Sequence, residues 1–166
     1  MLYQIEEWKT VKDKLYNEFK IEIKKRTIGV DDFDVPGTVM YEVPHFEDLT
    51  DEELFKCLNA LQEITGEIYV ITDTCYKNGF GPFFLEAEKL EGLIRHHHEI
   101  FKEMFFDTNA IIISFLEKKV WMFHHSGFVG LFDYSQLVNK SIENIVSHNS
   151  VGRMLYRIED WQTIKL

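Results

Sequence analysis

Three short apolar segments between residues 110 and 132 constrain the fold more than any other feature of the sequence. They span Ala110–Leu116, Val120–His124 and Phe128–Phe132. Only Glu117-Lys118-Lys119 and His125-Ser126-Gly127 lie between them, and Ser126-Gly127 is typical of a turn. Linkers this short join strands that run antiparallel, whereas parallel strands need long crossovers. The pattern therefore predicts a three-stranded antiparallel meander.

Three stretches before the meander have the apolar spacing of amphipathic helices. They are residues 5–25, a helix that follows Thr50, and Glu86–Met104. The middle one begins with Thr50-Asp51-Glu52-Glu53, a capping box in which the Thr50 hydroxyl accepts from the Glu53 amide and the Glu53 carboxylate reaches back. We expect this helix to stop at Gly66. Its expected buried face consists of Leu54, Leu58, Leu61 and Ile64.

The remaining segments complete the predicted fold. Thr38–Val43 and Ile68–Thr72 have the composition of strands, Ser141–Val146 that of a short helix, and Arg153–Ile158 that of a strand or a helix. Helices interleaved with an antiparallel meander predict an α+β fold, in which helices pack on an antiparallel sheet. A length of 166 residues predicts a single domain over 1–166.

The composition indicates a folded cytoplasmic protein. Fourteen Phe, seven Tyr and three Trp supply a large core. Residues 1–25 mix charges throughout and lack the apolar centre of a signal peptide. No run approaches the roughly 20 apolar residues of a membrane helix, so no membrane association is expected. Two cysteines, Cys57 and Cys75, are too few for a disulfide framework and fit a reducing compartment.

The net charge of −10 lies almost entirely in residues 31–67, which hold eleven carboxylates and one base, Lys56. A concentrated negative field attracts a basic partner and repels phosphate backbones. The alternative is an ordinary solvated acidic face. The short basic cluster Lys24-Lys25-Arg26 is explained by its place at a predicted helix C-terminus, where positive charge is favourable. We therefore expect a basic protein as partner and no nucleic acid.

Histidines and Cys75 are the candidates for catalysis or metal binding. Of His96, His97 and His98, only His97 lies on the apolar helix face, where a buried structural role is expected. His124 and His125 are expected to point to opposite faces of a strand. Because these histidine side chains are expected to point in different directions, we expect neither a metal site nor a cofactor. The chain has no Gly-x-Ser-x-Gly elbow or phosphate loop, so the enzyme alternative is a small cytosolic enzyme that uses Cys75 or the His124/His125 region.

One set of short motifs resembles a known family. It consists of Asp73-x-Cys75-Tyr76, Gly79-Phe80-Gly81-Pro82-Phe83, Ala110-Ile111-Ile112-Ile113-Ser114 and Trp121-x-Phe123-His124-His125-x-Gly127. This central third of the chain resembles small bacterial immunity proteins of contact-dependent growth inhibition and related polymorphic toxin systems. The resemblance implies a cytoplasmic antitoxin without catalytic residues, which binds and neutralises one cognate toxin domain, commonly a nuclease.

The acidic stretch supplies the predicted toxin-binding residues. A toxin that cleaves nucleic acid needs a basic surface to hold phosphates, and an inhibitor that covers this surface should present carboxylates. Phe33 is the expected aromatic anchor, beside Tyr41 and Phe46; the alternative for Phe33 and Phe46 is that they pack their loops onto the core. The expected binding carboxylates are Asp31, Asp32, Asp34, Glu47, Asp48, Asp51 and Glu52.

Overall fold

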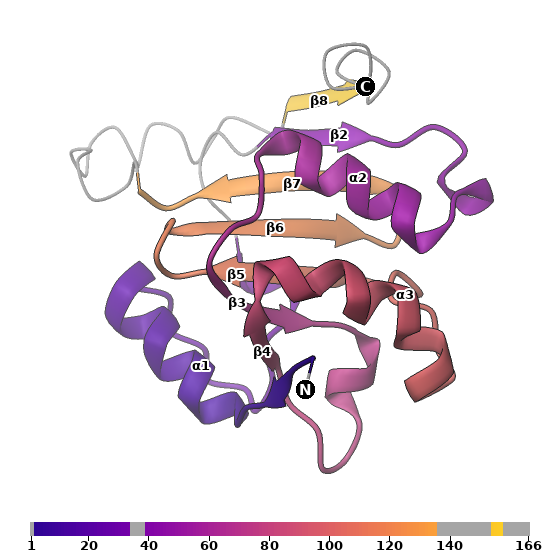
Figure 1. Cartoon of the computed structure of the whole chain (residues 1–166). Coiled ribbons are helices and arrows are strands. Elements are labelled where there is room, and N and C mark those ends of the chain that lie inside the picture. The colour runs from indigo at the N-terminus through magenta and orange to yellow at the C-terminus, as the bar shows by residue number, and fades with distance from the viewer. Residues whose placement is uncertain (1, 34–38, 136–153, 158–166) are drawn as a thin grey trace.

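The computed structural model describes residues 2–33, 39–135 and 154–157, and within them eight strands form one sheet (Figure 1). The strand order is β1-β4-β3-β5-β6-β7-β2-β8. Every neighbouring pair is antiparallel except β2 and β8, which are parallel. The predicted meander is confirmed as β5, β6 and β7, and so is the α+β class. The strands are β1 (Gln4–Ile5), β2 (Val39–Glu42), β3 (Glu67–Ile71), β4 (Phe83–Glu86), β5 (Ala110–Ser114), β6 (Lys119–His124), β7 (Phe128–Asp133) and β8 (Met154–Arg157).

Helices α2 (Asp51–Leu61) and α3 (Leu90–Phe101) lie side by side on one face of the sheet (Figure 1). Trp121 and Phe123 of β6 point to this face. The Trp121 Nε1 donates to the Gln62 carbonyl just after α2, at 3.0 Å, and the Phe123 ring packs against Phe106, at 5.2 Å between centroids. None of the helices in the described ranges is long and apolar enough to cross a membrane.

The N-terminal segment covers the opposite face. Phe132 of β7 is paired with Val120, so its side chain points away from the face of Trp121 and Phe123. Its ring contacts Phe33, with centroids 6.4 Å apart. Phe19 stacks on Tyr134, which follows β7, at 4.7 Å. The sheet is therefore buried between α2 and α3 on one side and segment 8–33 on the other.

The predicted helix over residues 5–25 is too long at both ends. Ile5 pairs with β4, α1 begins at Trp8 (Trp8–Lys14), and a π-helical turn continues it to Phe19. Lys20 then takes a left-handed φ of 61° and ends the helix. After it, Ile21 and Ile23 pack on the core, while Glu22 between them and Lys24 after them are exposed. This alternation is that of an extended chain, which the helical periodicity of the preceding turns concealed.

The predicted helix over Glu86–Met104 begins too early, because its first residues belong to β4. Phe83 and Phe84 pair with both β1 and β3. A short 3₁₀ turn, Ala87–Lys89, leads into α3. Lys102, with φ of 62°, ends α3. The strand β4 has only four residues and lies between a loop that contains Gly79 and Gly81 and a helix. Its periodicity is too short to distinguish it from its neighbours in the sequence.

The capping box at the start of α2 is confirmed, and the predicted end of this helix is wrong. The Glu53 amide donates to the Thr50 hydroxyl at 3.2 Å, and the Thr50 amide donates to the Glu53 carboxylate at 3.4 Å. At the other end Gln62 is extended, because the Asn59 side chain accepts from the Ile64 amide at 2.8 Å in place of a helical bond. Gly66, with φ of 72°, instead lies directly before the first residue of β3.

The strand predictions agree with the structure. Thr38–Val43 contains β2, Ile68–Thr72 overlaps β3, and Arg153–Ile158 contains β8, which is a strand and not a helix. The short helix expected over Ser141–Val146 lies outside the described residues.

Candidate functional site

Asp31 and Asp32, at the start of the predicted binding surface, form ion pairs and hydrogen bonds with other residues of this chain. Lys25 Nζ lies 3.1 Å from Asp31 and 3.2 Å from Asp32. The hydrogen bond from Lys25 lowers the pKa of the Asp31 carboxyl. Asp32 also accepts from the Gly29 amide at 2.7 Å. Asp34 lies outside the described residues.

Phe33 is not an exposed anchor. Its side chain is fully buried against the sheet, so the packing alternative is the correct one and the prediction of a partner contact is wrong. Phe46 is half-buried, and its ring packs on Phe123 with centroids 6.1 Å apart. Tyr41 is half-buried against the core as well. Most of the aromatic surface that we expected a partner to contact is therefore packed against the core of the protein.

The prediction that Asp51 is a partner-binding carboxylate is also wrong. Its side chain is buried, and its two carboxylate oxygens accept from the Phe105 amide at 2.7 Å and the Phe106 amide at 3.3 Å. A buried carboxylate with two backbone donors holds a loop in place. It is therefore not available to a partner.

The other predicted carboxylates near α2 are accessible. Glu47 and Asp48 are exposed in a 3₁₀ turn, Phe46–Asp48, and no ion pair joins them to another described residue. Glu52 is exposed and lies 3.5 Å from Arg95 Nε, in a pair in which both side chains are more than half exposed. Such an exposed pair contributes little to stability, so Glu52 can leave Arg95 and pair with a cation of a partner.

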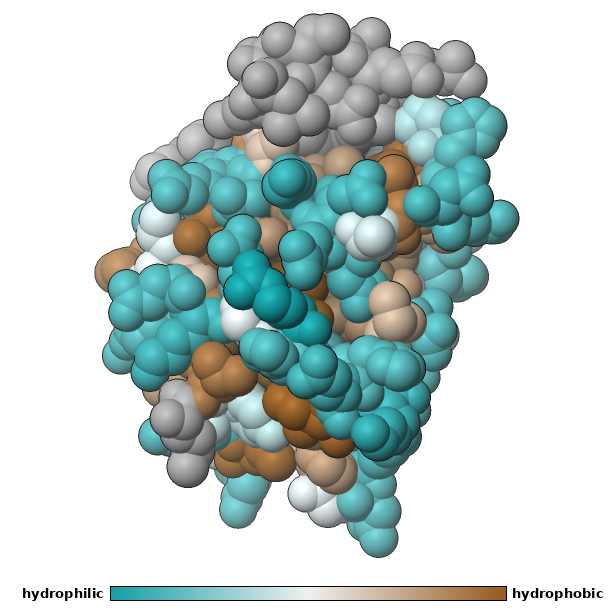
Figure 2. Space-filling model, turned by 45° about the vertical axis from the view of Figure 1, so that its right-hand side comes forward, coloured by the Kyte–Doolittle hydropathy of each residue, from teal (hydrophilic) through white to brown (hydrophobic). Residues whose placement is uncertain are grey.

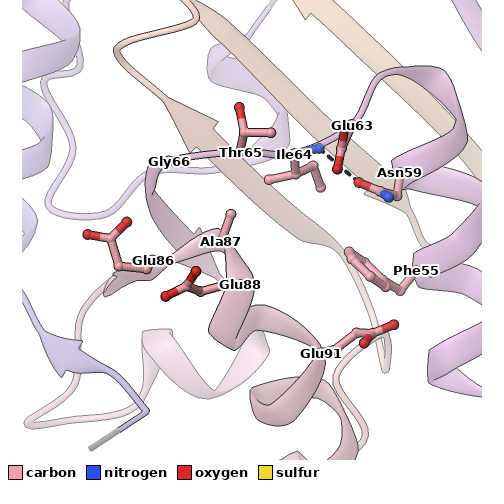
Figure 3. A pocket seen from close by; sticks show the side chains of 10 residues that line it. All are labelled: Phe55, Asn59, Glu63, Ile64, Thr65, Gly66, Glu86, Ala87, Glu88 and Glu91. Atoms are coloured by element: carbon pink, nitrogen blue, oxygen red, sulfur yellow. Dashed lines mark hydrogen bonds between the residues drawn. The ribbon is translucent and has the colours of Figure 1, made fainter.

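A further acidic site lies in a hollow of about 350 Å³ between the end of α2 and the start of α3 (Figure 3). We call it the acidic hollow. Phe55 of α2 forms an apolar part of its wall. Four exposed glutamates surround it: Glu63 after α2, Glu86 at the end of β4, Glu88 in the 3₁₀ turn and Glu91 in α3.

Local structure brings these four glutamates together. The Asn59–Ile64 hydrogen bond ends α2 and turns the chain, which places Glu63 at the rim. The bond from the Ala87 amide to the Gly66 carbonyl, 2.8 Å long, joins the start of β3 to the end of β4 and positions Glu86 and Glu88. None of the four makes an ion pair with another described residue.

The helix dipole explains only part of this arrangement. Anions are favourable near a helix N-terminus, as Glu88 and Glu91 are to α3, but unfavourable near a C-terminus, where Glu63 follows α2. Glu67 of β3 lies directly opposite Glu86 of β4 in the antiparallel ladder. Like charges in this position destabilise a sheet. The hollow thus concentrates negative charge at some cost to stability.

Sequence reasoning missed most of this site. Glu63 lies inside the acidic window of residues 31–67, but Glu86, Glu88 and Glu91 lie outside it, in the helix predicted over Glu86–Met104. The available signal was their spacing in Glu86-x-Glu88-x-x-Glu91. That spacing gains meaning only when β3 and β4 pair and bring them beside Glu63.

Hydrophilic side chains cover most of the face shown in Figure 2, and apolar side chains reach the surface there in small groups. The large exposed apolar residues of the described chain are Ile5, Tyr16, Ile100, Met104 and Leu116. Because large apolar patches mark many permanent interfaces, this surface suits a polar, charge-based contact better.

The geometry disfavours Cys75 as a nucleophile. Its side chain is fully buried, and burial raises the pKa of the thiol to about 11. The reactive species is the thiolate, which needs a lowered pKa and access to substrate. The Thr72 hydroxyl lies between this thiol and His97: it is 3.9 Å from Cys75 Sγ and 3.4 Å from His97 Nε2.

The expectation that His124 and His125 point to opposite faces is wrong. Their ring centroids are 4.2 Å apart, because His125 lies past the end of β6, where strand alternation no longer holds. His125 Nδ1 lies 3.1 Å from the Asn109 side chain, and His124 Nδ1 accepts from the Ser126 amide at 3.1 Å. Within the described ranges, no three His, Cys, Asp or Glu side chains are grouped so that they could hold a metal ion.

Neither a protein-family model, nor a curated protein, nor a solved structure matches this chain. The resemblance to immunity proteins therefore stays a prediction from sequence motifs, and the acidic hollow is interpreted from its own geometry.

Proposed function

We propose that this chain is an immunity (antitoxin) protein that binds and neutralises a basic toxin domain, expected to be a nuclease, through the acidic hollow. The observation that carries the proposal is the set of four exposed glutamates around one hollow, with no ion pair to another described residue. A surface of this kind lowers the free energy of a complex whose partner supplies the missing cations.

The hollow suits an arginine or lysine side chain of the partner. Carboxylates on several sides can accept from a guanidinium, which forms paired, directional bonds with them. The half-buried Phe55 ring offers a face on which the guanidinium or the aliphatic stem can rest. A nuclease supplies such side chains because its active site must bind phosphates.

Glu47, Asp48 and Glu52 extend the proposed surface. They are the exposed members of the predicted carboxylate set near the start of α2. Charges at the rim of an interface act mainly on the association rate. We therefore assign them a steering role, and assign Glu63, Glu88 and Glu91 the direct contact.

The test is binding to the toxin-like domain encoded immediately upstream of the gene, at low and moderate salt. We compare the parent with the triple variant Glu63→Gln, Glu88→Gln, Glu91→Gln. The matched control is Glu7→Gln, Glu18→Gln, Glu22→Gln, which removes the same charge from the α1 segment. At low salt we expect the hollow variant to associate at least about tenfold more slowly, and the control to change little.

The possible outcomes separate the parts of the proposal. Equal slowing in both triple variants would mean that net charge matters and the hollow does not. Tight binding that salt does not weaken would keep the partner and move the interface to another surface. No binding at micromolar concentrations would contradict the immunity function itself.

A further inference from the structure

The loop between α3 and β5, residues 102–109, is held by polar side chains from other elements and by the packing of its two phenylalanines. We call it the α3–β5 loop. It contains Phe105 and Phe106, both buried against the core. Its bonds join it to α2, to α3 and to the segment after β3. They are Asp51 with the Phe105 and Phe106 amides, His97 with the Glu103 carbonyl, Thr74 and Lys77 with the Glu103 carboxylate, and Thr108 with Asp73.

His97 lies at the centre of these contacts. It is fully buried, and its ring packs against Phe101 and Phe105, with centroids at 4.8 and 5.4 Å. Its Nδ1 is 2.8 Å from the Glu103 carbonyl oxygen, and its Nε2 is 3.4 Å from the Thr72 hydroxyl. A single side chain thus joins α3, the end of β3 and the α3–β5 loop.

A neutral imidazole satisfies these contacts without a buried charge. A carbonyl oxygen only accepts, so Nδ1 carries the proton and donates to Glu103. Nε2 then has a lone pair, which can accept from the Thr72 hydroxyl. Protonation would put a second N–H at Nε2, so the buried Thr72 hydroxyl would have to turn and accept from it. It would also place a full charge in a site without solvent.

We propose that His97 and the α3–β5 loop form a proton-operated latch: neutral His97 holds the loop closed, and protonation opens the loop and exposes Phe105 and Phe106 while the sheet stays folded. Local opening of this kind needs a segment whose closure depends on few contacts. The α3–β5 loop has no strand pairing, so its closure depends on these side-chain hydrogen bonds and on the packing of Phe105 and Phe106. The latch does not depend on the proposed function.

Burial, and not the neighbouring charges, sets the direction in which His97 responds to pH. Burial lowers the pKa of His97 below its ordinary value of 6.5; the bond to the Glu103 carbonyl and the charges of Asp51 and Glu103 oppose this shift, and His98 adds to it. The buried Cys75, beyond Thr72, has a pKa raised to about 11 and stays neutral. The closed state therefore disfavours protonated His97. Closure is fully present above pH 6.5 and weakens as the pH falls below it, until the closed state itself takes up the proton.

Hydrogen exchange measures this opening directly. We would follow the protection factors of the Phe105 and Phe106 amides from about pH 7.5 to about pH 5.5, where ordinary carboxylates stay ionised. We expect them to fall by up to about tenfold per pH unit below pH 6.5. The amides of β5 and β6 should keep their protection. Constant protection at Phe105 and Phe106, or an equal fall in the strands, would overturn the latch.

Two variants test whether His97 is the trigger. His97→Asn keeps a donor near the position of Nδ1 and cannot take up a proton, so the pH response should disappear. His98→Asn, at the exposed neighbouring position, is the matched control and should keep the response. A full response in His97→Asn would overturn the assignment.

An NMR titration of the His97 ring in the parent provides a test that does not depend on how well the variant folds. Its midpoint should coincide with that of loop opening. Separate midpoints would also overturn the assignment.

Discussion

At the residue scale, Asp51 shows how one carboxylate can have two quite different roles. Its place in the first turn of α2 suits a solvated helix-terminal anion, and that position in the sequence suggested an interface. In the structure it accepts from two amides of a loop that lies more than fifty residues further along the chain. Its neighbour Glu52 remains exposed. Two adjacent acids thus differ completely in what their removal should cost.

We expect Asp51→Ala to lower the free energy of unfolding by about 2–4 kcal/mol, because it leaves two buried amides without an acceptor. Glu52→Ala is the matched control. It should cost less than about 1 kcal/mol, since it removes only an exposed ion pair. Urea unfolding of both variants provides the comparison. Equal costs would show that the Asp51 bonds do not hold the α3–β5 loop.

At the element scale, the turn between β6 and β7 is shaped by close packing against the Phe46–Asp48 turn. Gly127 has a φ of 88°, and a Cβ built there would lie 2.3 Å from the Phe46 ring. Its carbonyl also accepts from the Val43 amide at 2.8 Å. Phe46 is therefore fixed between the meander and β2. This explains why it serves the fold and is not a free anchor.

Gly79 is a matched control for Gly127, because its φ is 84° but nothing lies within 4 Å of a Cβ built there. Gly79→Ala should cost only the left-handed strain, about 1 kcal/mol. Gly127→Ala should cost about 1–3 kcal/mol more, because Phe46 must move. Thermal or urea unfolding measures both. If the two variants were equally destabilised, the Phe46 contact would not restrict the turn.

At the scale of the whole molecule, the charge of −10 is distributed unevenly. Asp31 and Asp32 share one cation, Lys25, which offsets part of their charge, whereas the glutamates of the acidic hollow have no such partner in the described chain. Self-repulsion opposes the compact state. The charges that we propose to attract a basic partner therefore destabilise the free protein.

Salt should act in opposite directions on stability and on binding. Added NaCl screens the repulsion, so we expect the Tm of the free protein to rise while association with a basic partner slows. The Glu63/Glu88/Glu91→Gln variant should show a smaller rise in Tm than the Glu7/Glu18/Glu22→Gln control. Scanning calorimetry over a salt series measures this. An equal rise in the two variants would contradict a special concentration of charge at the hollow.

The sequence by itself determined the features that depend on near neighbours. The meander, the capping box at Thr50, the class of the fold and the burial of His97 follow from periodicity, turn residues and hydrogen bonds within a few positions. The start of α1 and the strand β4 that precedes α3 did not, because Ile5, Phe83 and Phe84 pair with distant segments.

Only the tertiary structure decided which acids face solvent. A carboxylate is buried or exposed according to the donors that reach it, and for Asp51 these donors come from the α3–β5 loop. Glu86 and Glu88 meet Glu63 only because β4 pairs with β3. The net charge of the chain, or of any stretch of it, can be counted from the sequence. Charge at a site depends on contacts between residues far apart in the sequence.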